Sequence, residues 1–416
     1  MSLIVGGCAS TPRVDAGVTD SFDWALHPAE EAGLSRSGLD GLRTAVQKHI
    51  DNNQLTGAVT AVARHNKLVW HEAQGLNDLQ AGTPMRKDDL FRMMSSTKPV
   101  TAVAVLMMVE EGKLSLEDKV SRFIPEFKDQ RVASVQAGAG NSVTLVPAHR
   151  EITVKDLLTH TSGLSSLNGL VPGPASSKVN KIERRPDDTL ADYIPRLGAA
   201  ALDFQPGSRW GYSALDGFDV LLRIVEIVSR QKGDVFLQER LFQPLGMRDT
   251  CFNVPPENRP RVLTLYGREQ DRWKAQKPML GDGLTRYIFG AGGLYSTAHD
   301  FLLFELMLLN KGSLNGNRIL KPETVALMSR NHVGALFAEW FPPLSAGKGF
   351  GLGVSVVEDA SKGNGRGVGA FGWGGAYGTE TWVDPELDVA AVLLVQQPVD
   401  SVRPAFQQAL RAAIVA

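Results

Sequence analysis

The apolar positions near the start of the chain follow the period of a helix. In residues 37–53 they recur at Leu39, Leu42, Val46 and Ile50. This spacing places the four side chains on one face of a helix. We therefore expect an amphipathic helix in this segment.

Strand-like patterns follow and give way to a longer apolar run. Residues 56–62 and 67–73 are rich in β-formers and flank a short polar turn, which predicts a hairpin. The next apolar run begins near Ser95, continues through Met108 and stops at Gly112. Its breadth predicts a buried helix that Gly112 ends.

The chain ends in a second group of strands. Residues 369–373, 377–383 and 388–396 predict three consecutive strands, and residues 401–415 predict a closing helix. Residues 113–289 instead show short helical pieces separated by clusters of Pro, Gly and Ser. Strands at both chain ends predict one sheet that is assembled from both ends and interrupted by a helical insertion.

The predicted fold class is therefore α/β plus all-α. We expect a discontinuous α/β sheet domain from residues 24–94 and 290–416, a mainly helical domain with loop insertions from 95–289, and a flexible lead from 1–23. A length of 416 residues is sufficient for two packed lobes. The 43% hydrophobic and 21% charged content is typical of a globular protein.

Charge and hydropathy narrow the classes of partner. A formal net charge of −1 provides no electrostatic attraction to nucleic acid or to an anionic membrane surface. No apolar run approaches the roughly 18 residues that a membrane span needs. The apolar residues 389–395 are interpreted as a buried strand. We expect a small-molecule substrate, and the oligomeric state stays open.

The two cysteines, Cys8 and Cys251, lie too far apart in the sequence to indicate a disulfide framework or a metal pattern. Residues 3–10 resemble the end of a bacterial lipoprotein signal, in which a small residue precedes the lipidated cysteine. The segment lacks a charged start and a full apolar core. Two interpretations stay open: a lipid anchor at Cys8 of a periplasmic protein whose signal is truncated, or an accidental match in a cytoplasmic protein.

Ser95 and Lys98 stand three residues apart at the start of the predicted buried helix. Serine is a weak nucleophile at neutral pH and needs a neighbouring base to take its proton. Residues three apart share a helix face, so the Lys98 amine can reach Ser95 Oγ. An ordinary lysine keeps its proton at neutral pH, so this role requires desolvation or a second cation. The N–H groups of the first helical turn also favour negative charge that develops at Ser95.

The same spacing occurs twice more, at Ser229 with Lys232 and at Ser345 with Lys348. Ser229 ends an amphipathic helix, where it is interpreted as a solvated cap. Ser345 lies in a segment rich in Pro and Gly that predicts a loop. On spacing alone, Ser95 as a simple helix N-cap would remain the favoured interpretation.

Four segments supply further evidence: FRMMSSTKP at 91–99, DLLTHTSGL at 156–164, PLGMRDT at 244–250 and GAGGLYSTA at 290–298. In order and spacing they resemble the landmarks of class C β-lactamase-like, penicillin-recognising serine hydrolases, and most of all the family VIII carboxylesterases. The similarity spans residues 34–397. It implies the β-lactamase/penicillin-binding-protein-like fold, with a central antiparallel sheet and an inserted helical domain. It also implies Ser95 as the nucleophile and Lys98 as its base.

Tyr212, in the string WGYSA, occupies the place of the family's second element, a tyrosine in a Y-x-N or Y-S-x motif. The resemblance implies that its phenol passes a proton between Ser95, Lys98 and the leaving group. Ala214 replaces the asparagine of true β-lactamases and removes an amide that would help to orient the substrate. The alternative is a packing role for Tyr212 beside Trp210.

The third element departs most from the β-lactamases, because Trp373-Gly374-Gly375 stands where they carry K-T-G or H-T-G. The resemblance implies that the N–H groups of Ser95 and Ala376 form the oxyanion hole. Paired glycines would let a substrate approach the strand edge closely. Trp373 would place an apolar wall at the substrate site, although a strand tryptophan is often a core residue.

Several other kinds of site are not predicted. The sequence has no G-x-S-x-G elbow, which argues against an α/β-hydrolase. It has no H-E-x-x-H motif and no clustered Cys and His ligands, so we expect no metal and no cofactor. His160 is interpreted as a structural hydrogen-bonding residue rather than a base.

The sequence therefore favours a serine carboxylesterase that hydrolyses short-chain esters through an acyl-enzyme, with weak or no β-lactamase activity. Three alternatives stay open: a β-lactamase or D-amino peptidase on the same fold, an acyltransferase, and a non-catalytic penicillin-recognising binding protein.

Overall fold

The structure is a computed structural model that describes residues 22–135, 142–164, 173–270, 272–281, 283–340 and 342–415. Cys8 and almost all of the predicted lead lie outside these residues. Within them, no helix has the length and apolar character needed to cross a membrane.

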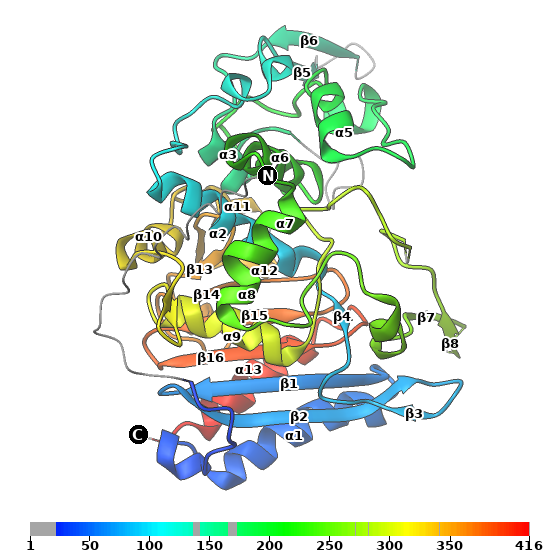
Figure 1. Ribbon diagram of the computed structural model, residues 1–416, viewed down its shortest axis with the longest axis vertical. Coiled ribbons are helices and arrows are strands. Elements are labelled where there is room, and N and C mark those ends of the chain that lie inside the picture. Colours follow the sequence, from blue (N-terminus) through cyan, green and yellow to red (C-terminus); the bar gives the residue numbers. More distant parts are fainter. Residues whose placement is uncertain are drawn as a thin grey trace, which may run out of the picture.

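Strands are concentrated toward both ends of the described residues, and most of the helices lie between them (Figure 1). The helices are α1 (Arg36–Asp51), α2 (Thr97–Glu110), α3 (Val154–Leu158), α4 (Pro174–Lys178), α5 (Leu190–Leu197), α6 (Asp216–Ser229), α7 (Gly233–Leu237), α8 (Gln243–Leu245), α9 (Ala298–Leu309), α10 (Pro322–Met328), α11 (Leu336–Trp340), α12 (Pro342–Ser345) and α13 (Val402–Ala413). The strands are β1 (Gly57–Arg64), β2 (Lys67–Asp78), β3 (Thr83–Pro84), β4 (Phe91–Arg92), β5 (Arg131–Val135), β6 (Val143–Pro147), β7 (Tyr266–Glu269), β8 (Arg272–Ala275), β9 (Tyr295–Ser296), β10 (Ser313–Leu314), β11 (Asn317–Arg318), β12 (Lys348–Phe350), β13 (Ser355–Val357), β14 (Phe371–Gly374), β15 (Glu380–Asp384) and β16 (Val389–Leu394).

The main sheet has eight strands in the order β12-β13-β14-β15-β16-β1-β2-β3. Every neighbouring pair in it is antiparallel. Strands β1 and β16 come from opposite ends of the chain and lie side by side at its centre, with Val59 opposite Leu394 (Figure 1). The prediction of one antiparallel sheet built from both chain ends is confirmed.

Strand β16 explains why the sheet is buried on both faces. Its residues alternate between two hydrophobic cores, as side chains in a strand must. Val392 and Leu394 join a core that includes side chains of α2, α6 and α9, whereas Ala391 and Leu393 join a core with α1 and α13. A strand covered by helices on both faces has an unbroken apolar sequence, so the buried strand predicted for residues 389–395 is confirmed.

The terminal elements also agree with the sequence patterns. Helix α1 begins after Ser35, whose side chain accepts a hydrogen bond from Gly38 N–H. The β1–β2 turn places His65 and Asn66 in the left-handed region, at φ values of 53° and 55°, and asparagine tolerates this region better than most residues. The closing helix is α13.

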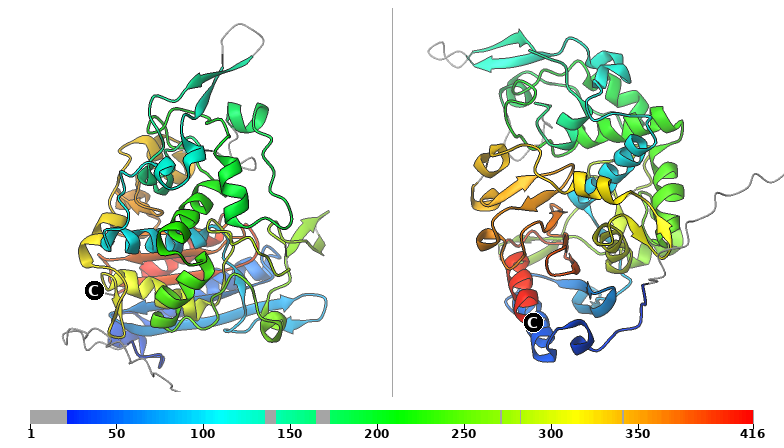
Figure 2. Two further views of the ribbon diagram at one scale, coloured as in Figure 1. Left: turned by 45° about the horizontal axis from the view of Figure 1, so that its top comes forward. Right: turned by 90° about the vertical axis from the view of Figure 1, so that its left-hand side faces the viewer.

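The region between the two groups of strands is mainly helical, but it also contains the hairpins β5–β6 and β7–β8, which the sequence patterns did not predict. The β5–β6 hairpin projects from the end of the molecule that lies away from α1 and α13 (Figure 2). Helix α2 packs against both α6 and β14 and so joins this region to the sheet. The predicted domain boundaries stay a prediction.

Candidate active site

Ser95 lies at a sharp strand-to-helix connection. Strand β4 ends at Arg92, a 3₁₀ turn covers Met94–Ser96, and α2 begins at Thr97. Met94 enters this turn with a φ of 48°, a left-handed conformation that a methionine rarely adopts. The connection therefore holds Ser95 in a fixed orientation ahead of a helix that is almost entirely buried.

The structure brings Ser95, Lys98 and Tyr212 together. Lys98 Nζ lies 3.1 Å from Ser95 Oγ, and Tyr212 OH donates a hydrogen bond to the same oxygen at 2.7 Å. The ammonium position of Lys98 also lies 5.0 Å from the centre of the Tyr212 ring. Residues from α2 and from the segment before α6 thus converge on one hydroxyl oxygen.

The Lys98 amine is completely buried and has three polar neighbours. Besides Ser95 Oγ, it donates to the backbone carbonyls of Ala214 at 2.7 Å and Ala291 at 2.8 Å. These two carbonyls hold Nζ within hydrogen-bonding distance of Ser95 Oγ, which is the position that a general base requires.

Aromatic side chains surround Tyr212. Trp373 Nε1 donates a hydrogen bond to its hydroxyl at 3.2 Å. The ring of His160 lies 4.8 Å from the Tyr212 ring, and His160 Nδ1 accepts the backbone N–H of Ser213. Burial, followed by the charge of Lys98, holds the pKa of His160 well below its ordinary value. A neutral, buried imidazole in these contacts agrees with the structural role expected for His160.

The turn that follows β14 contains Ala376. Gly375 lies directly against the segment before Ser95, because a Cβ added to it would stand 2.3 Å from Met93 O. Among the described residues, no hydrogen-bond acceptor is found for Ala376 N–H. The N–H groups of a first helical turn also have no acceptor within the helix. Ser95 and Ala376 therefore belong to neighbouring segments. Within the described residues, neither of their N–H groups, which are predicted to form the oxyanion hole, has a hydrogen-bond acceptor.

The adjacent glycines have a packing reason as well as the predicted substrate role. A Cβ at Gly374 would stand 2.5 Å from a carboxylate oxygen of Glu380, and a Cβ at Gly375 would stand 2.3 Å from Thr379 Oγ1. Such distances are far below normal contact. The protein itself fills the space that a side chain would need, and substrate contact with these glycines stays a prediction.

Asp219 on α6 binds two residues next to the site, Ala291 and Tyr287, and the sequence patterns did not predict this role. Its carboxylate accepts Ala291 N–H at 3.0 Å and Tyr287 OH at 2.9 Å. Burial, with a smaller contribution from Asp216, raises its pKa from 3.8 to about 7, although both hydrogen bonds and Lys98 act in the opposite direction. Asp219 therefore fixes Ala291, whose carbonyl accepts from Lys98.

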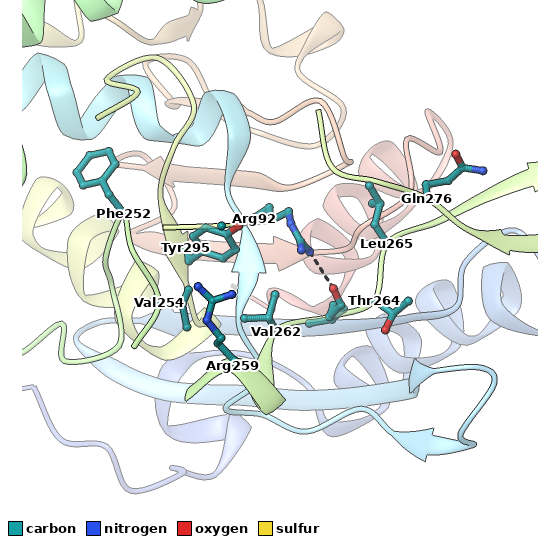
Figure 3. Close-up of a pocket in the computed structure, with 11 residues that line it drawn as sticks. Arg92, Phe252, Val254, Arg259, Val262, Thr264, Leu265, Gln276 and Tyr295 are labelled. Atoms are coloured by element: carbon teal, nitrogen blue, oxygen red, sulfur yellow. Dashed lines mark hydrogen bonds between the residues drawn. The ribbon is translucent and has the colours of Figure 1, made fainter. Parts of the chain in front are cut away.

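Two adjoining cavities lie beside β4 and β9. The larger measures about 270 Å³ and is lined by both polar and apolar side chains, including Arg92, Arg259 and Phe252 (Figure 3). The smaller, of about 30 Å³, shares Arg92 and Phe252 with it and reaches Met94 and Tyr377. Met94 and Tyr377 are the chain neighbours of Ser95 and Ala376. The smaller cavity therefore approaches the segments of Ser95 and Ala376, but the residues that line the two cavities do not include Ser95, Lys98 or Tyr212.

The two other serines with the same spacing to a lysine lie in different surroundings. Ser229 is the last residue of α6, and its Oγ accepts Gln231 N–H at 3.2 Å in the turn that follows, while Arg230 is the C-cap residue of the helix. The expectation of a loop at Ser345 was wrong, because Ser345 ends the one-turn helix α12 and is buried. Its hydroxyl donates to Ala338 O at 3.1 Å.

The described residues contain no group of three or more His, Cys, Asp or Glu side chains arranged to hold a metal ion. Cys251 is a free thiol, and burial raises its pKa to about 12. The residues that converge at Ser95 are instead a hydroxyl, an amine, a phenol and backbone N–H groups. Together with the fold, they define the protein as a serine hydrolase.

Comparison with known proteins gives the family. A family model described as Beta-lactamase matches residues 42–415, and the chain belongs to this family. Protein Rv1367c of Mycobacterium tuberculosis is 39% identical over 371 residues, which cover 86% of this chain and 90% of the relative. Esterase EstB of Burkholderia gladioli is 35% identical over 386 residues, which cover 87% of this chain and 91% of the relative.

Among solved structures, EstCE1, described as a hydrolase with promiscuous acyltransferase activity, superposes with a TM-score of 0.74 at 27% identity. The match covers 91% of this chain and 99% of EstCE1. The resemblance to class C β-lactamase-like hydrolases, and the fold it implies, are confirmed.

Proposed function

We propose that this protein is a carboxylesterase that acts through an acyl-enzyme on Ser95. The observation that carries the proposal is the position of Ser95 Oγ between Lys98 Nζ, at 3.1 Å, and Tyr212 OH, at 2.7 Å. The similarity to Esterase EstB supports the choice of esters over the other substrates of the family.

In the acylation step, Ser95 Oγ attacks the ester carbonyl carbon while Lys98 takes the serine proton. The carbonyl oxygen becomes an oxyanion that accepts hydrogen bonds from the N–H groups of Ser95 and Ala376. Tyr212 donates its proton to the alcohol oxygen as the carbon–oxygen bond breaks, and it regains a proton from Lys98. The products are the free alcohol and an ester of Ser95.

In the deacylation step, the same groups work in reverse. Tyr212 and Lys98 take a proton from a water molecule, which attacks the acyl carbon. Ser95 Oγ leaves and is protonated again, and the carboxylic acid is released. An acceptor alcohol in place of water would make the same enzyme an acyltransferase, which is why both activities must be measured.

We further propose that short-chain esters are better substrates than β-lactams. Trp373 places an indole at the strand edge, where it packs against Phe350 at a ring distance of 5.3 Å. An indole has no positive charge to pair with the carboxylate of a β-lactam. A simple ester has no carboxylate and therefore loses nothing at this position.

The test is covalent labelling combined with turnover of p-nitrophenyl butyrate. An activated alkyl phosphonate should add its mass to the peptide that contains Ser95, and Ser95→Ala should abolish both labelling and turnover. Lys98→Ala and Tyr212→Phe should each lower kcat by about 10²-fold or more. Because the three residues act as one unit, the double variant should be little worse than the single ones.

Ser229→Ala is the matched control, since Ser229 has the same spacing to a lysine but its hydroxyl accepts a backbone N–H. It should keep normal turnover. Near-normal activity of folded Ser95→Ala would contradict the proposal. Faster product formation with added alcohols would favour the acyltransferase. Faster turnover of a chromogenic cephalosporin than of the ester would favour the β-lactamase. Labelling of Ser95 without any turnover would favour the non-catalytic binding protein.

A further inference from the structure

The carbonyl of Gly375 and the N–H of Ala376 belong to one peptide unit. This unit is planar, and in a trans peptide the two groups point in opposite directions. No cis peptide bond occurs among the described residues. A group that fixes the Gly375 carbonyl on one side therefore fixes the direction of Ala376 N–H on the other side.

Arg403 on α13 binds this carbonyl. Its Nη2 donates to Gly375 O at 2.7 Å and to Thr379 O at 3.1 Å, and its Nε donates to Gly378 O at 3.4 Å. One guanidinium thus holds three carbonyls of the turn from Gly375 to Thr379. Hydrogen bonds from a charged donor are stronger than those between neutral groups.

Arg403 is itself fixed in place. Glu380 on β15 lies 3.5 Å from Arg403 Nε, and Gln407, one turn along α13, donates to the same carboxylate at 3.3 Å. Gly374 stands opposite Glu380 in the sheet and leaves room for the pair, because a Cβ there would meet both side chains. The guanidinium therefore has a defined position relative to the strand.

The other side of the turn is tied to the nucleophile. Thr379 Oγ1 donates to Met93 O at 3.1 Å and lies 3.0 Å from Ser96 Oγ. Met93 and Ser96 bracket Ser95 in the chain. Hydrogen bonds through Thr379 and Arg403 thus hold the two proposed oxyanion donors in one rigid arrangement.

We propose that Arg403 is a positioning residue for the oxyanion hole, acting through the Gly375–Ala376 peptide. Its charge orients this peptide and polarises it, which makes Ala376 N–H a stronger donor to the oxyanion. The inference rests on the proposed function, because it assumes acyl transfer at Ser95. The partners of Arg403 are the carbonyls of the turn and the carboxylate of Glu380, so it would act on the reaction through the turn.

The test compares Arg403→Met with Arg403→Lys, which keeps one charged donor, and with Arg411→Met, a change on the same helix at an exposed residue. Removing an oxyanion donor outright costs about 10²- to 10³-fold in kcat. Loss of its orientation should cost less, about 10- to 100-fold, with KM changed by less than about threefold. Arg403→Lys should recover part of kcat, and Arg411→Met should match the unmodified enzyme.

The readout that separates positioning from stability is the affinity for a boronic acid that forms a tetrahedral adduct on Ser95. Because the adduct resembles the transition state, its affinity should fall by the same factor as kcat/KM. Unchanged kcat in folded Arg403→Met, or a fall in kcat without loss of boronic acid affinity, would overturn the inference. If Arg403→Met does not fold, the same two measurements on Arg403→Lys decide in the same way.

Failure of the inference and failure of the proposed function give different results. If Ser95 of the unmodified enzyme is labelled and Ser95→Ala is inactive, the proposed function stands whatever Arg403→Met does. If Ser95 is not labelled, the oxyanion role of Arg403 falls with the proposed function.

Discussion

Asp219 is a buried acid that binds the N–H of Ala291, whose carbonyl accepts from Lys98, and its environment makes the stability of the protein depend on pH. Burial raises its pKa from 3.8 to about 7. Between these two values the unfolded chain has lost the proton that the folded protein still holds. The folded state then binds more protons than the unfolded state, so the free energy of unfolding falls as pH rises from about 4 to about 7 and levels off above that.

Asp219→Asn should remove this contribution, because an amide does not ionise and can still accept Ala291 N–H. We expect the Tm of the unmodified protein to fall more steeply between pH 4.5 and 7.5 than that of the variant. Thermal unfolding followed by calorimetry at a series of pH values measures both slopes. Glu305, whose pKa burial raises to about 8, contributes in the same direction in both proteins and cancels from the comparison. Identical slopes for the two proteins would contradict the raised pKa of Asp219.

Motifs identified the side chains of the site better than its backbone. Ser95, Lys98 and Tyr212 could be predicted because each stands in a recognisable string. The carbonyls of Ala214 and Ala291, which hold Lys98, could not, because any residue type supplies a carbonyl. Arg403 reaches the turn only because α13 packs beside it in the folded protein, so no local sequence pattern predicts this contact.

The turn between β14 and β15 is the element on which the proposed oxyanion hole would depend, and Gly375→Ala tests it. The new Cβ would stand 2.3 Å from the backbone oxygen of Met93, which cannot move aside easily. The turn must shift instead, and a displacement of about 1 Å costs on the order of 10²-fold in rate. Steady-state kinetics with p-nitrophenyl butyrate should show this loss in kcat.

Gly41→Ala on α1 is the matched control for Gly375→Ala. A Cβ at Gly41 meets nothing within 4 Å. Alanine in a helix interior is more stable than glycine by roughly 1 kcal/mol, so this variant should melt at a slightly higher temperature with unchanged kcat. Equal kcat for the two variants would show that the turn does not position a catalytic group.

The predicted and missed elements differ in length. Helix α1, the β1–β2 hairpin and β16 extend over enough residues for their apolar period to be visible. Strands β12 and β13 have three residues each, and β4 has two, so they carry no period of their own. They form because neighbouring strands and β9 offer hydrogen-bond partners, which is a property of the folded chain.

At the scale of the whole molecule, the candidate site is assembled from three distant segments, of which only β14 belongs to the main sheet. Ser95 follows a strand near the start of the chain, Tyr212 precedes α6 in the helical region, and Trp373 lies on β14 near the end. Strand β14 packs against the Met94–Ser96 turn that contains Ser95. Substrate preference therefore depends on contacts between distant segments and is tested on the intact chain.

The preference for esters should appear as a ratio of two kcat/KM values, for p-nitrophenyl butyrate and for a chromogenic cephalosporin. A cephalosporin carboxylate beside the Trp373 indole forgoes a charge-assisted hydrogen bond worth roughly 1.5–3 kcal/mol, which is about a 10- to 100-fold loss in rate. Trp373→Lys supplies a cation and should narrow the ratio.

Since Trp373 Nε1 also donates to Tyr212 OH, Trp373→Phe is the control that removes this donor without adding charge. Trp373→Phe should lower both rates by a similar factor and leave the ratio unchanged. A preference of the unmodified enzyme for the cephalosporin would refute the ester assignment, and equal ratios for Trp373→Lys and Trp373→Phe would show that charge at this position does not select the substrate.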